Sequence, residues 1–276
     1  MSALEKSHKK PRGRPRSEFS DKPTGTVAAL ERGLVLLNAL AREGYASLTE
    51  LSLITDIPAS TAHRLLMTFQ AFDYVDFNQE TNHWRIGVEA FRTGSAFTRQ
   101  LNIVEAAREI MHELVNETGE TANLAVPDGA EVVFVSQVET SNPIRAFFNP
   151  GTRSPMHVSG IGKAIMSTFD DSEIMRRIKG AALPRFTAQT LTSVEALQSD
   201  LNKTRERGWS FDDEERNTGM RCVAAPIFNE YREAVAGISL SGPAARLPLD
   251  TVKTLGPLVH RAADKITARI GGTKAT

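Results

Sequence analysis

The pattern of apolar residues changes sharply at residue 27, where helical spacing begins. From there apolar side chains recur every three or four residues, as along one face of an α-helix, and Gly44 follows the last of them. These side chains are Val27, Leu30, Leu34, Leu37 and Ala41. The pattern predicts a first helix over about residues 27–43 that buries this face.

Two further helices are indicated before residue 72. Ser47-Leu48-Thr49-Glu50 has the spacing of a capping box, in which each of the two end residues accepts a hydrogen bond from the other's backbone N–H. Leu51 and Ile54 would form the buried side of that helix, and Pro58 suits the first turn of a third helix. The third helix has an apolar face and a polar face: Ala62, Leu65, Leu66 and Phe69 lie on the first, and Ser60, Thr61, Arg64 and Thr68 on the second.

Two short alternating segments follow, Tyr74–Phe77 and His83–Ile86, with the polar run Asn78–Asn82 between them. This arrangement is typical of a β-hairpin. Three helices followed by a hairpin is the order of a winged helix-turn-helix, which we assign to residues 26–87. In such a motif its second helix, here the third of the chain, places its first turns in the major groove of DNA.

The remaining chain alternates between helical and strand-like patterns. A break near 100–102 predicts a linker helix over 88–102 and a second domain over 103–272. We expect strands at 122–126, 132–138, 144–148, 222–228 and 234–241, and helices near 160–168, 172–179, 194–207 and 250–270. Strands bracketed by helices predict an α+β protein whose second domain contains an antiparallel sheet.

Composition narrows the class of protein. The 276 residues are enough for two cores, and the 33 basic residues equal the 33 acidic ones. Cys222 is the single cysteine, which excludes a disulfide framework, and no apolar run is long enough to cross a membrane. We therefore expect a cytoplasmic protein without a metal, a cofactor or a membrane segment.

Residues 1–25 are polar and basic and have no hydrophobic periodicity, so we expect a disordered basic tail. Arg12 and Arg14 lie in the run Pro11–Arg16, which resembles an AT-hook that binds the minor groove. The alternative is a solvated basic tail.

The polar face of the third helix supplies candidate DNA contacts, and the wing adds one more. These are Ser60, Thr61, His63, Arg64, Thr68 and Arg85. Arg64 can pair with guanine or hold a phosphate, and the pattern leaves both open. An ordinary solvated face is the alternative, because acidic residues outnumber basic ones over residues 18–85 and DNA binding relies on phosphate neutralisation. The tail and dimerisation could compensate.

Several long motifs resemble IclR-type bacterial transcriptional regulators. They are Ala29–Leu34, Ile57–Leu66, His157–Ala164, Arg207–Glu215, Gly219–Pro226 and Ile238–Pro243. The resemblance spans about residues 26–271 and implies operator binding, a GAF-like effector-binding domain and a homodimer that pairs into a dimer of dimers. The family usually has glycine where Asp73 and Asn82 stand. Both residue types tolerate the left-handed conformation, so we expect the two turns to survive.

The resemblance also implies a pocket for a small carboxylate. The positions that match pocket residues of glyoxylate-responsive members are Asp212, Cys222, Ser239 and Ser241. Gly160 and Ile161 belong to a run of small residues before a helix, where backbone N–H groups can hold an anion. The spacing is not that of a nucleotide-binding loop.

The residue types in this pocket favour a short acid that carries a carbonyl or a hydroxyl. Ser239 and Ser241 alternate on a strand, so both hydroxyls can donate toward one side, whereas Asp212 would repel a second carboxylate and accept from a hydroxyl or a hydrated aldehyde. Glyoxylate fits this description of a short acid that carries a carbonyl. The similarity to members that control the β-hydroxyaspartate cycle also predicts that the chain regulates a carbon-metabolism operon. In the alternative reading Cys222 is a small buried hydrophobe and the serines are a polar strand face.

An enzyme is the main competing class. Cys222 as a nucleophile would need a base or a second cysteine, and no catalytic motif accompanies it. We therefore expect no catalytic residues. A protein that docks only onto other proteins is a third possibility.

Overall fold

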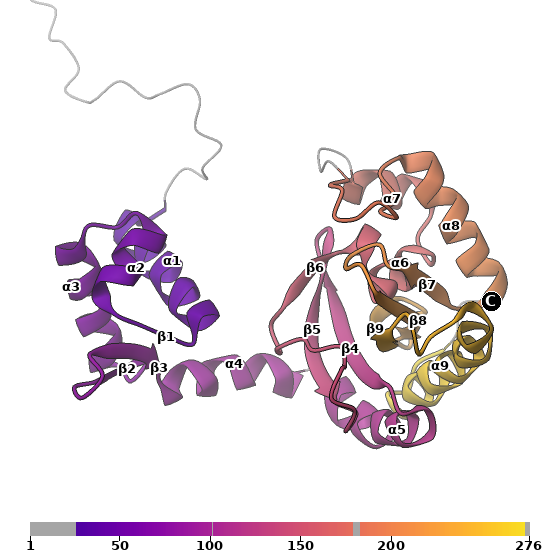
Figure 1. Ribbon diagram of the computed structural model, residues 1–276, viewed down its shortest axis with the longest axis horizontal. Helices are drawn as coiled ribbons and strands as arrows, with labels where there is room; N and C mark the ends of the chain where they lie inside the picture. Colours follow the sequence, from indigo (N-terminus) through magenta and orange to yellow (C-terminus); the bar gives the residue numbers. More distant parts are fainter. Residues whose placement is uncertain (1–25, 101, 179–182, 274–276) are drawn as a thin grey trace, which may run out of the picture. The chain divides into compact units, whose positions relative to one another are not determined.

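The computed structural model describes residues 26–100, 102–178 and 183–273 (Figure 1). The chain divides into two compact units, with the boundary between Ser95 and Ala96. Arg12 and Arg14, the expected minor-groove contacts, lie outside the described residues. None of the helices in the described ranges combines the length and the apolar composition that crossing a membrane requires.

The N-terminal unit is a three-helix fold followed by a hairpin. Its elements are α1 (Ala28–Glu43), β1 (Tyr45–Ala46), α2 (Leu48–Thr55), α3 (Ala59–Ala71), β2 (Val75–Asn78) and β3 (His83–Ile86). The strands form an antiparallel sheet in the order β1-β3-β2. The capping box at the start of α2 is confirmed, since the Ser47 N–H donates to Glu50 at 2.8 Å and the Glu50 N–H to the Ser47 hydroxyl at 3.3 Å.

The predicted buried face of α1 is wrong. Leu36 and Leu40 are fully buried, whereas Leu30 and Leu34 remain 59% and 50% exposed. The helix turns its other apolar side inward because Gly33 leaves room for Phe69, whose ring would lie 3.1 Å from a β-carbon at that position. In α2, likewise, Leu51 is buried while Ile54 is exposed.

Two turns require a left-handed backbone, and both contain a residue that tolerates it. Asp73, after α3, has φ 58°, and Asn82, in the hairpin, has φ 57°. The turns expected at these two non-glycine positions therefore form.

The C-terminal unit is built on one six-stranded antiparallel sheet in the order β6-β5-β4-β9-β8-β7. Its strands are β4 (Thr121–Asp128), β5 (Glu131–Val138), β6 (Arg153–Pro155), β7 (Ser210–Asp213), β8 (Met220–Phe228) and β9 (Ala234–Pro243). The strand predicted at 144–148 is wrong, and β6 and β7 were not predicted. Residues 139–152 form the connection between β5 and β6, and Ile144 and Phe147 within it are exposed.

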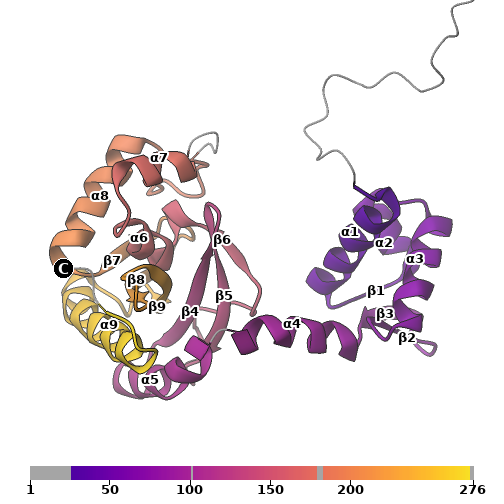
Figure 2. The ribbon, with the colours of Figure 1, turned by 180° about the vertical axis from the view of Figure 1, so that it is seen from behind.

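Helices cover both faces of this sheet (Figures 1 and 2). They are α5 (Asn102–Thr118), η1 (Met156–Val158), α6 (Gly160–Met166), α7 (Asp171–Ile178), α8 (Val194–Arg207) and α9 (Leu249–Arg269), and α4 (Val88–Gln100) precedes them. One core cluster joins α5 and α9 to the sheet, and a second joins α6, α7 and α8 to its opposite face. The predicted α+β class and antiparallel sheet are confirmed.

The alternation of side chains along the central strands separates the two faces. On β4, Ala122 and Leu124 point into the core beneath α5 and α9, so Asn123 faces the opposite side. On β9, Ile238 and Leu240 belong to the same core, and the serines that alternate with them face α6. A buried polar surface therefore lies between the sheet and the start of α6.

Candidate effector pocket and DNA-binding surface

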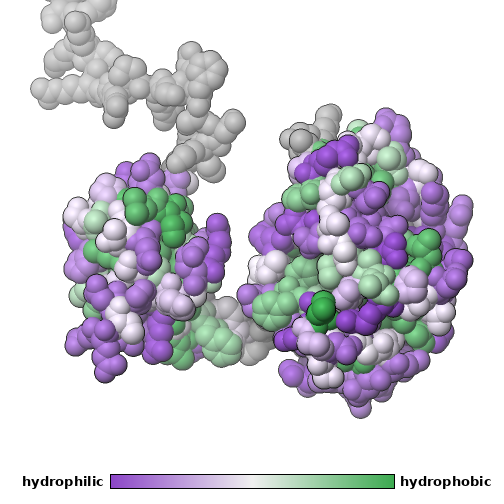
Figure 3. Space-filling model, in the orientation of Figure 1, coloured by the Kyte–Doolittle hydropathy of each residue, from purple (hydrophilic) through white to green (hydrophobic). Residues whose placement is uncertain are grey.

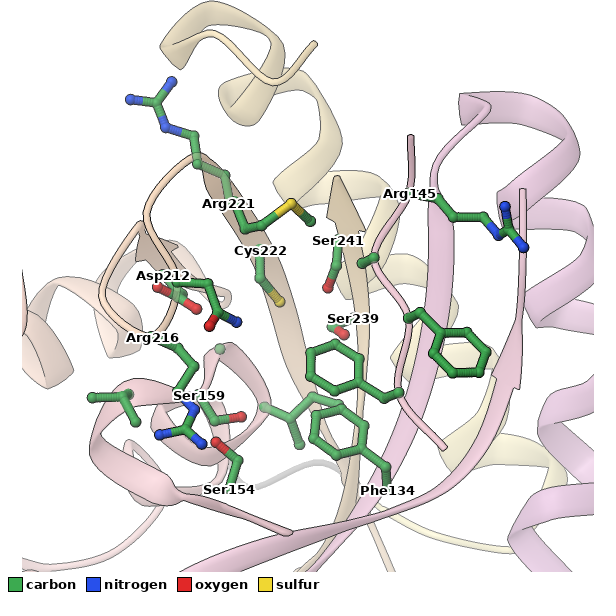
Figure 4. A pocket seen from close by; sticks show the side chains of 18 residues that line it. Phe134, Arg145, Ser154, Ser159, Asp212, Arg216, Arg221, Cys222, Ser239 and Ser241 are labelled. Carbon is green, nitrogen blue, oxygen red and sulfur yellow. The ribbon is translucent and has the colours of Figure 1, made fainter. Parts of the chain in front are cut away.

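A cavity of about 170 Å³ lies where the start of α6 approaches strands β7, β8 and β9 (Figure 4). The connection 139–152 forms the wall on the other side, with Phe148 stacked on Phe134 at 4.4 Å between ring centroids. The cavity brings together all six residues that the sequence suggested for an effector: Gly160, Ile161, Asp212, Cys222, Ser239 and Ser241. Their role in binding stays a prediction.

Strand pairing places three of these side chains in one row across the floor. Asp212 on β7 pairs with Cys222 on β8, which pairs with Ser241 on β9. Ser239 lies two residues earlier on β9, on the same face of the sheet. Three neighbouring strands thus present a carboxyl, a thiol and two hydroxyls to one small space.

Gly160 allows the start of α6 to reach this floor. A β-carbon at this position would lie 2.7 Å from the Cys222 sulfur, which is closer than van der Waals contact allows. The Ser159 hydroxyl caps the helix by accepting from the Gly162 N–H at 3.3 Å. The N–H groups of Gly160 and Ile161 belong to the first turn, so they have no acceptor within the helix and can donate to a ligand.

Asn123 was not suggested by the sequence, yet it lies under both serines. It is fully buried on β4, and its side-chain nitrogen donates to Ser241 at 3.2 Å and to Ser239 at 3.4 Å. Its side-chain oxygen accepts from Gln137 on β5 at 2.7 Å. Only strand pairing brings these residues together, because Asn123 is 116 positions from Ser239 in the chain.

Three arginines line the cavity, and they differ in direction. Arg145 and Arg221 point away from it (Figure 4), each bound to a carboxylate at 2.5 and 2.7 Å respectively. The guanidinium of Arg216 lies beside Ser154 and Ser159 at the cavity edge (Figure 4), and it stacks over the ring of an aromatic side chain. Arg216 directly follows the Arg207–Glu215 motif, but no local pattern distinguishes it.

A buried ion cluster lies directly behind the cavity. Lys163 of α6 is 0% exposed, and its ammonium donates to the Glu215 carboxylate at 2.6 Å and to the Phe211 carbonyl at 2.5 Å. Asp200 of α8 lies 2.9 Å from the same nitrogen. Asp212 is joined to this cluster, since it accepts from the Glu215 backbone N–H at 2.8 Å.

Burial shifts the acidity of these groups. It raises the pKa of Asp212 to about 6 and that of Glu215 to about 7, although the charge of Lys163 partly opposes both shifts. Burial alone would lower the pKa of Lys163, but the surrounding carboxylates raise it. Burial also raises the pKa of Cys222 to about 12, so this side chain stays a thiol at neutral pH and is a poor nucleophile.

The candidate DNA contacts lie in the N-terminal unit. Ser60, His63, Arg64 and Thr68 are exposed on α3, and Thr61 is half-buried. Arg85 is exposed on β3, where it forms an ion pair with Asp76 at 3.4 Å. The exposed face of α3 thus carries the polar set that the sequence predicted, whereas contact with DNA itself stays a prediction.

Comparison with known families decides the class. The model for the IclR helix-turn-helix domain matches residues 29–79, and the model for the C-terminal domain of bacterial transcriptional regulators of the IclR type matches residues 95–268. The chain belongs to the IclR family. It is therefore a DNA-binding transcriptional regulator, and the resemblance inferred from its motifs is confirmed.

Curated IclR-family relatives match over nearly the whole chain. The HTH-type transcriptional regulator BhcR of Paracoccus denitrificans is 43% identical, over 93% of each chain. The transcriptional repressor IclR of Escherichia coli is 40% identical, over 95% of this chain and 97% of the relative. These proteins are regulators, which confirms the expectation that the chain is a regulator rather than an enzyme.

Solved structures share the fold. The IclR protein of Thermotoga maritima superposes with a TM-score of 0.75 at 26% identity, over 88% of this chain and 98% of that one. An IclR homologue of Microbacterium hydrocarbonoxydans, solved as a complex with 4-hydroxybenzoate, superposes with a TM-score of 0.78 at 19% identity, over 88% of this chain and 99% of that one.

The raised pKa values of Asp212 and Glu215 predict a pH-dependent stability. In the unfolded chain both carboxyls would lose their protons near pH 4, whereas the folded protein keeps them up to about pH 6 to 7. Their contribution to the free energy of unfolding therefore falls as pH rises from about 4 to 7.

Glu215→Gln removes one of these groups, so the stability of the wild type relative to this variant should decline over that pH range. Urea unfolding at several pH values measures it, with Glu206→Gln, at an exposed position on α8, as control. A difference that stays constant or grows with pH would contradict the assignment.

Proposed function

We propose that a short organic acid, with glyoxylate as first candidate, binds in the cavity and modulates the binding of α3 to an operator. The observation that carries this proposal is the convergence of donors on one small space. Ser239 and Ser241 are held there as neighbours, the start of α6 offers two backbone N–H groups, and Arg216 adds a positive charge at the edge. A carboxylate is the ligand that such donors suit.

The position of Asp212 favours a ligand acid that also carries a hydroxyl or a hydrated aldehyde. It lies across the floor from Ser241, two strands away. As a carboxylate it accepts from a hydroxyl, and it repels a second negative charge. The cavity of about 170 Å³ suits a small acid.

An aromatic acid is the second candidate, because the stacked rings of Phe134 and Phe148 form an apolar wall. The complex of an IclR homologue with 4-hydroxybenzoate shows that one protein of this fold takes such a ligand. The floor of the cavity in this chain is polar, which favours the shorter acid.

The target of regulation is proposed from the relatives. BhcR is similar over 93% of the chain, and the acetate operon repressor of Salmonella typhimurium is 40% identical over 95% of it. We therefore place the chain in the cytoplasm as a regulator of a carbon-metabolism operon.

Dimerisation is proposed from an apolar surface of the N-terminal unit. Leu30 and Leu34 on α1 and Phe91 on α4 are at least half exposed, although each is large and apolar. In Figure 3 hydrophobic side chains gather in two places on this unit, one on its upper part and one along α4, with polar residues between them. Such a surface is typical of a protein interface. Two copies paired in this way would present two α3 helices to a near-palindromic DNA site. The C-terminal effector-binding domains would then pair two such dimers into a tetramer.

Arg64 is expected to contact DNA. Arg64→Ala should weaken operator binding by about 1–3 kcal/mol if the side chain reads a base, and should reduce the salt dependence by about one ion if it holds a phosphate. Fluorescence anisotropy with DNA from upstream of the chain's own gene, at several salt concentrations, distinguishes the two. Arg108→Ala, at an exposed position of the C-terminal unit, is the control. Unchanged affinity and salt slope for Arg64→Ala would show that α3 does not bind as proposed.

The double substitution Leu30→Glu, Leu34→Glu should convert the proposed tetramer into dimers held together only by their C-terminal domains, because it places four negative charges in each interface between two N-terminal units. Analytical ultracentrifugation measures the mass of the full chain. Leu249→Glu, at an exposed leucine of the C-terminal unit, is the control for an added surface charge. A double variant whose mass equals that of the wild-type assembly would exclude this surface as the interface.

Gly160→Ala should lower affinity for glyoxylate by tenfold or more, because the added methyl group would press on Cys222 at the cavity floor. Gly94→Ala is the matched control, since nothing lies within 4 Å of a β-carbon there. Calorimetry with glyoxylate, glycolate and 4-hydroxybenzoate measures affinity and selectivity. Wild-type protein that binds only the aromatic acid would overturn the short-acid proposal.

A further inference from the structure

The two serines of the cavity floor belong to a hydrogen-bond chain that crosses three strands. The pairing register sets Gln137, Asn123 and Ser239 side by side on β5, β4 and β9. Gln137 donates to Asn123 at 2.7 Å, and Asn123 donates to both serine hydroxyls. At the other end of the chain, the backbone N–H of Phe148 donates to the Gln137 side-chain oxygen at 3.5 Å.

The backbone N–H of Phe148 fixes which group donates and which accepts at each step of this hydrogen-bond chain. A backbone N–H can only donate, so it holds the oxygen end of the Gln137 amide and leaves the nitrogen end for Asn123. If the Asn123 amide were reversed, two NH₂ groups would face each other at 2.7 Å. The one consistent arrangement is therefore that in which Asn123 turns its NH₂ group toward the serines.

This direction decides what the serines can offer a ligand. A serine hydroxyl can donate or accept, and its surroundings choose between the two. Ser239 and Ser241 already accept from Asn123, so each keeps its own proton for another partner.

We propose that Asn123, oriented by Gln137 and the Phe148 N–H, is a specificity-determining positioning residue that makes both serines hydrogen-bond donors and so selects anionic acceptors over ligands that must donate. The inference rests on the acid-binding function proposed above and adds a cause for its selectivity. Because Phe148 lies in the connection that walls the cavity, the same chain also links the position of that wall to the serines.

Two substitutions test the direction of the chain, and neither alters a serine. Asn123→Asp has the same shape but lacks the NH₂ group. Burial raises the pKa of a carboxyl at this position, so the variant is measured above that pKa, where its carboxylate accepts from the serines and turns their protons away from the cavity. Gln137→Met introduces no charge and removes the group that orients Asn123. The matched control is Asn116→Asp, which adds the same charge at an exposed position of α5, on the other face of the sheet and outside the hydrogen-bond chain.

The measurement is the ratio of affinities for glycolate and for glycolamide, its uncharged amide, by calorimetry on the full chain in 0.15 M salt. Wild type should prefer the acid by about tenfold or more, the size of one hydrogen bond to a charged group. Asn123→Asp should abolish that preference and Gln137→Met should reduce it severalfold, whereas Asn116→Asp should change it by less than about threefold.

A purely structural role would weaken both ligands equally and leave the ratio unchanged. A wild-type ratio in both Asn123→Asp and Gln137→Met would overturn the proposal, and if Asn123→Asp does not fold, Gln137→Met decides alone. Wild-type protein that binds none of the acids would instead refute the acid-binding function itself. The two failures are therefore distinguishable.

Discussion

The buried ammonium of Lys163 joins the elements of the C-terminal unit that surround the cavity. It joins α6 to the Glu215 segment, to the backbone of β7 and to Asp200 of α8. A buried lysine needs carboxylate and carbonyl partners, because an ammonium that is removed from water and left unpaired is very unfavourable. Since α6 begins at the cavity and Asp212 is bound to the Glu215 N–H, the same interaction fixes the position of the cavity walls.

The second constraint is the alternation of side chains on β4 and β9. One face of the sheet must be apolar, because α5 and α9 bury it, and the residues between must face α6. Asn123 and Ser239 on that face are almost wholly buried, so each needs a hydrogen-bond partner inside the protein. The sheet therefore provides a polar floor held by internal hydrogen bonds. In the proposed function its donors are oriented before a ligand binds, which reduces the entropy lost on binding.

Local patterns predicted much of this structure. The helix expected at 194–207 has those bounds, and the capping box and the turns at Asp73 and Asn82 formed as their residue types require. The errors arose where long-range packing decides. Leu30 and Leu34 have the spacing of a core face, but Gly33 and Phe69 rotate α1 the other way.

The pocket residues show the same contrast between local motifs and long-range strand pairing. Motif segments contained Gly160, Ile161, Asp212, Cys222, Ser239 and Ser241, and the fold gathers all six. Asn123 lies in no such motif and reaches the serines only through strand register.

The most direct test of the whole account is operator affinity measured with and without saturating glyoxylate at one salt concentration. Coupling between the two sites predicts a change of about fivefold or more in either direction. Equal operator affinity in both conditions, with glyoxylate shown to be bound, would contradict it.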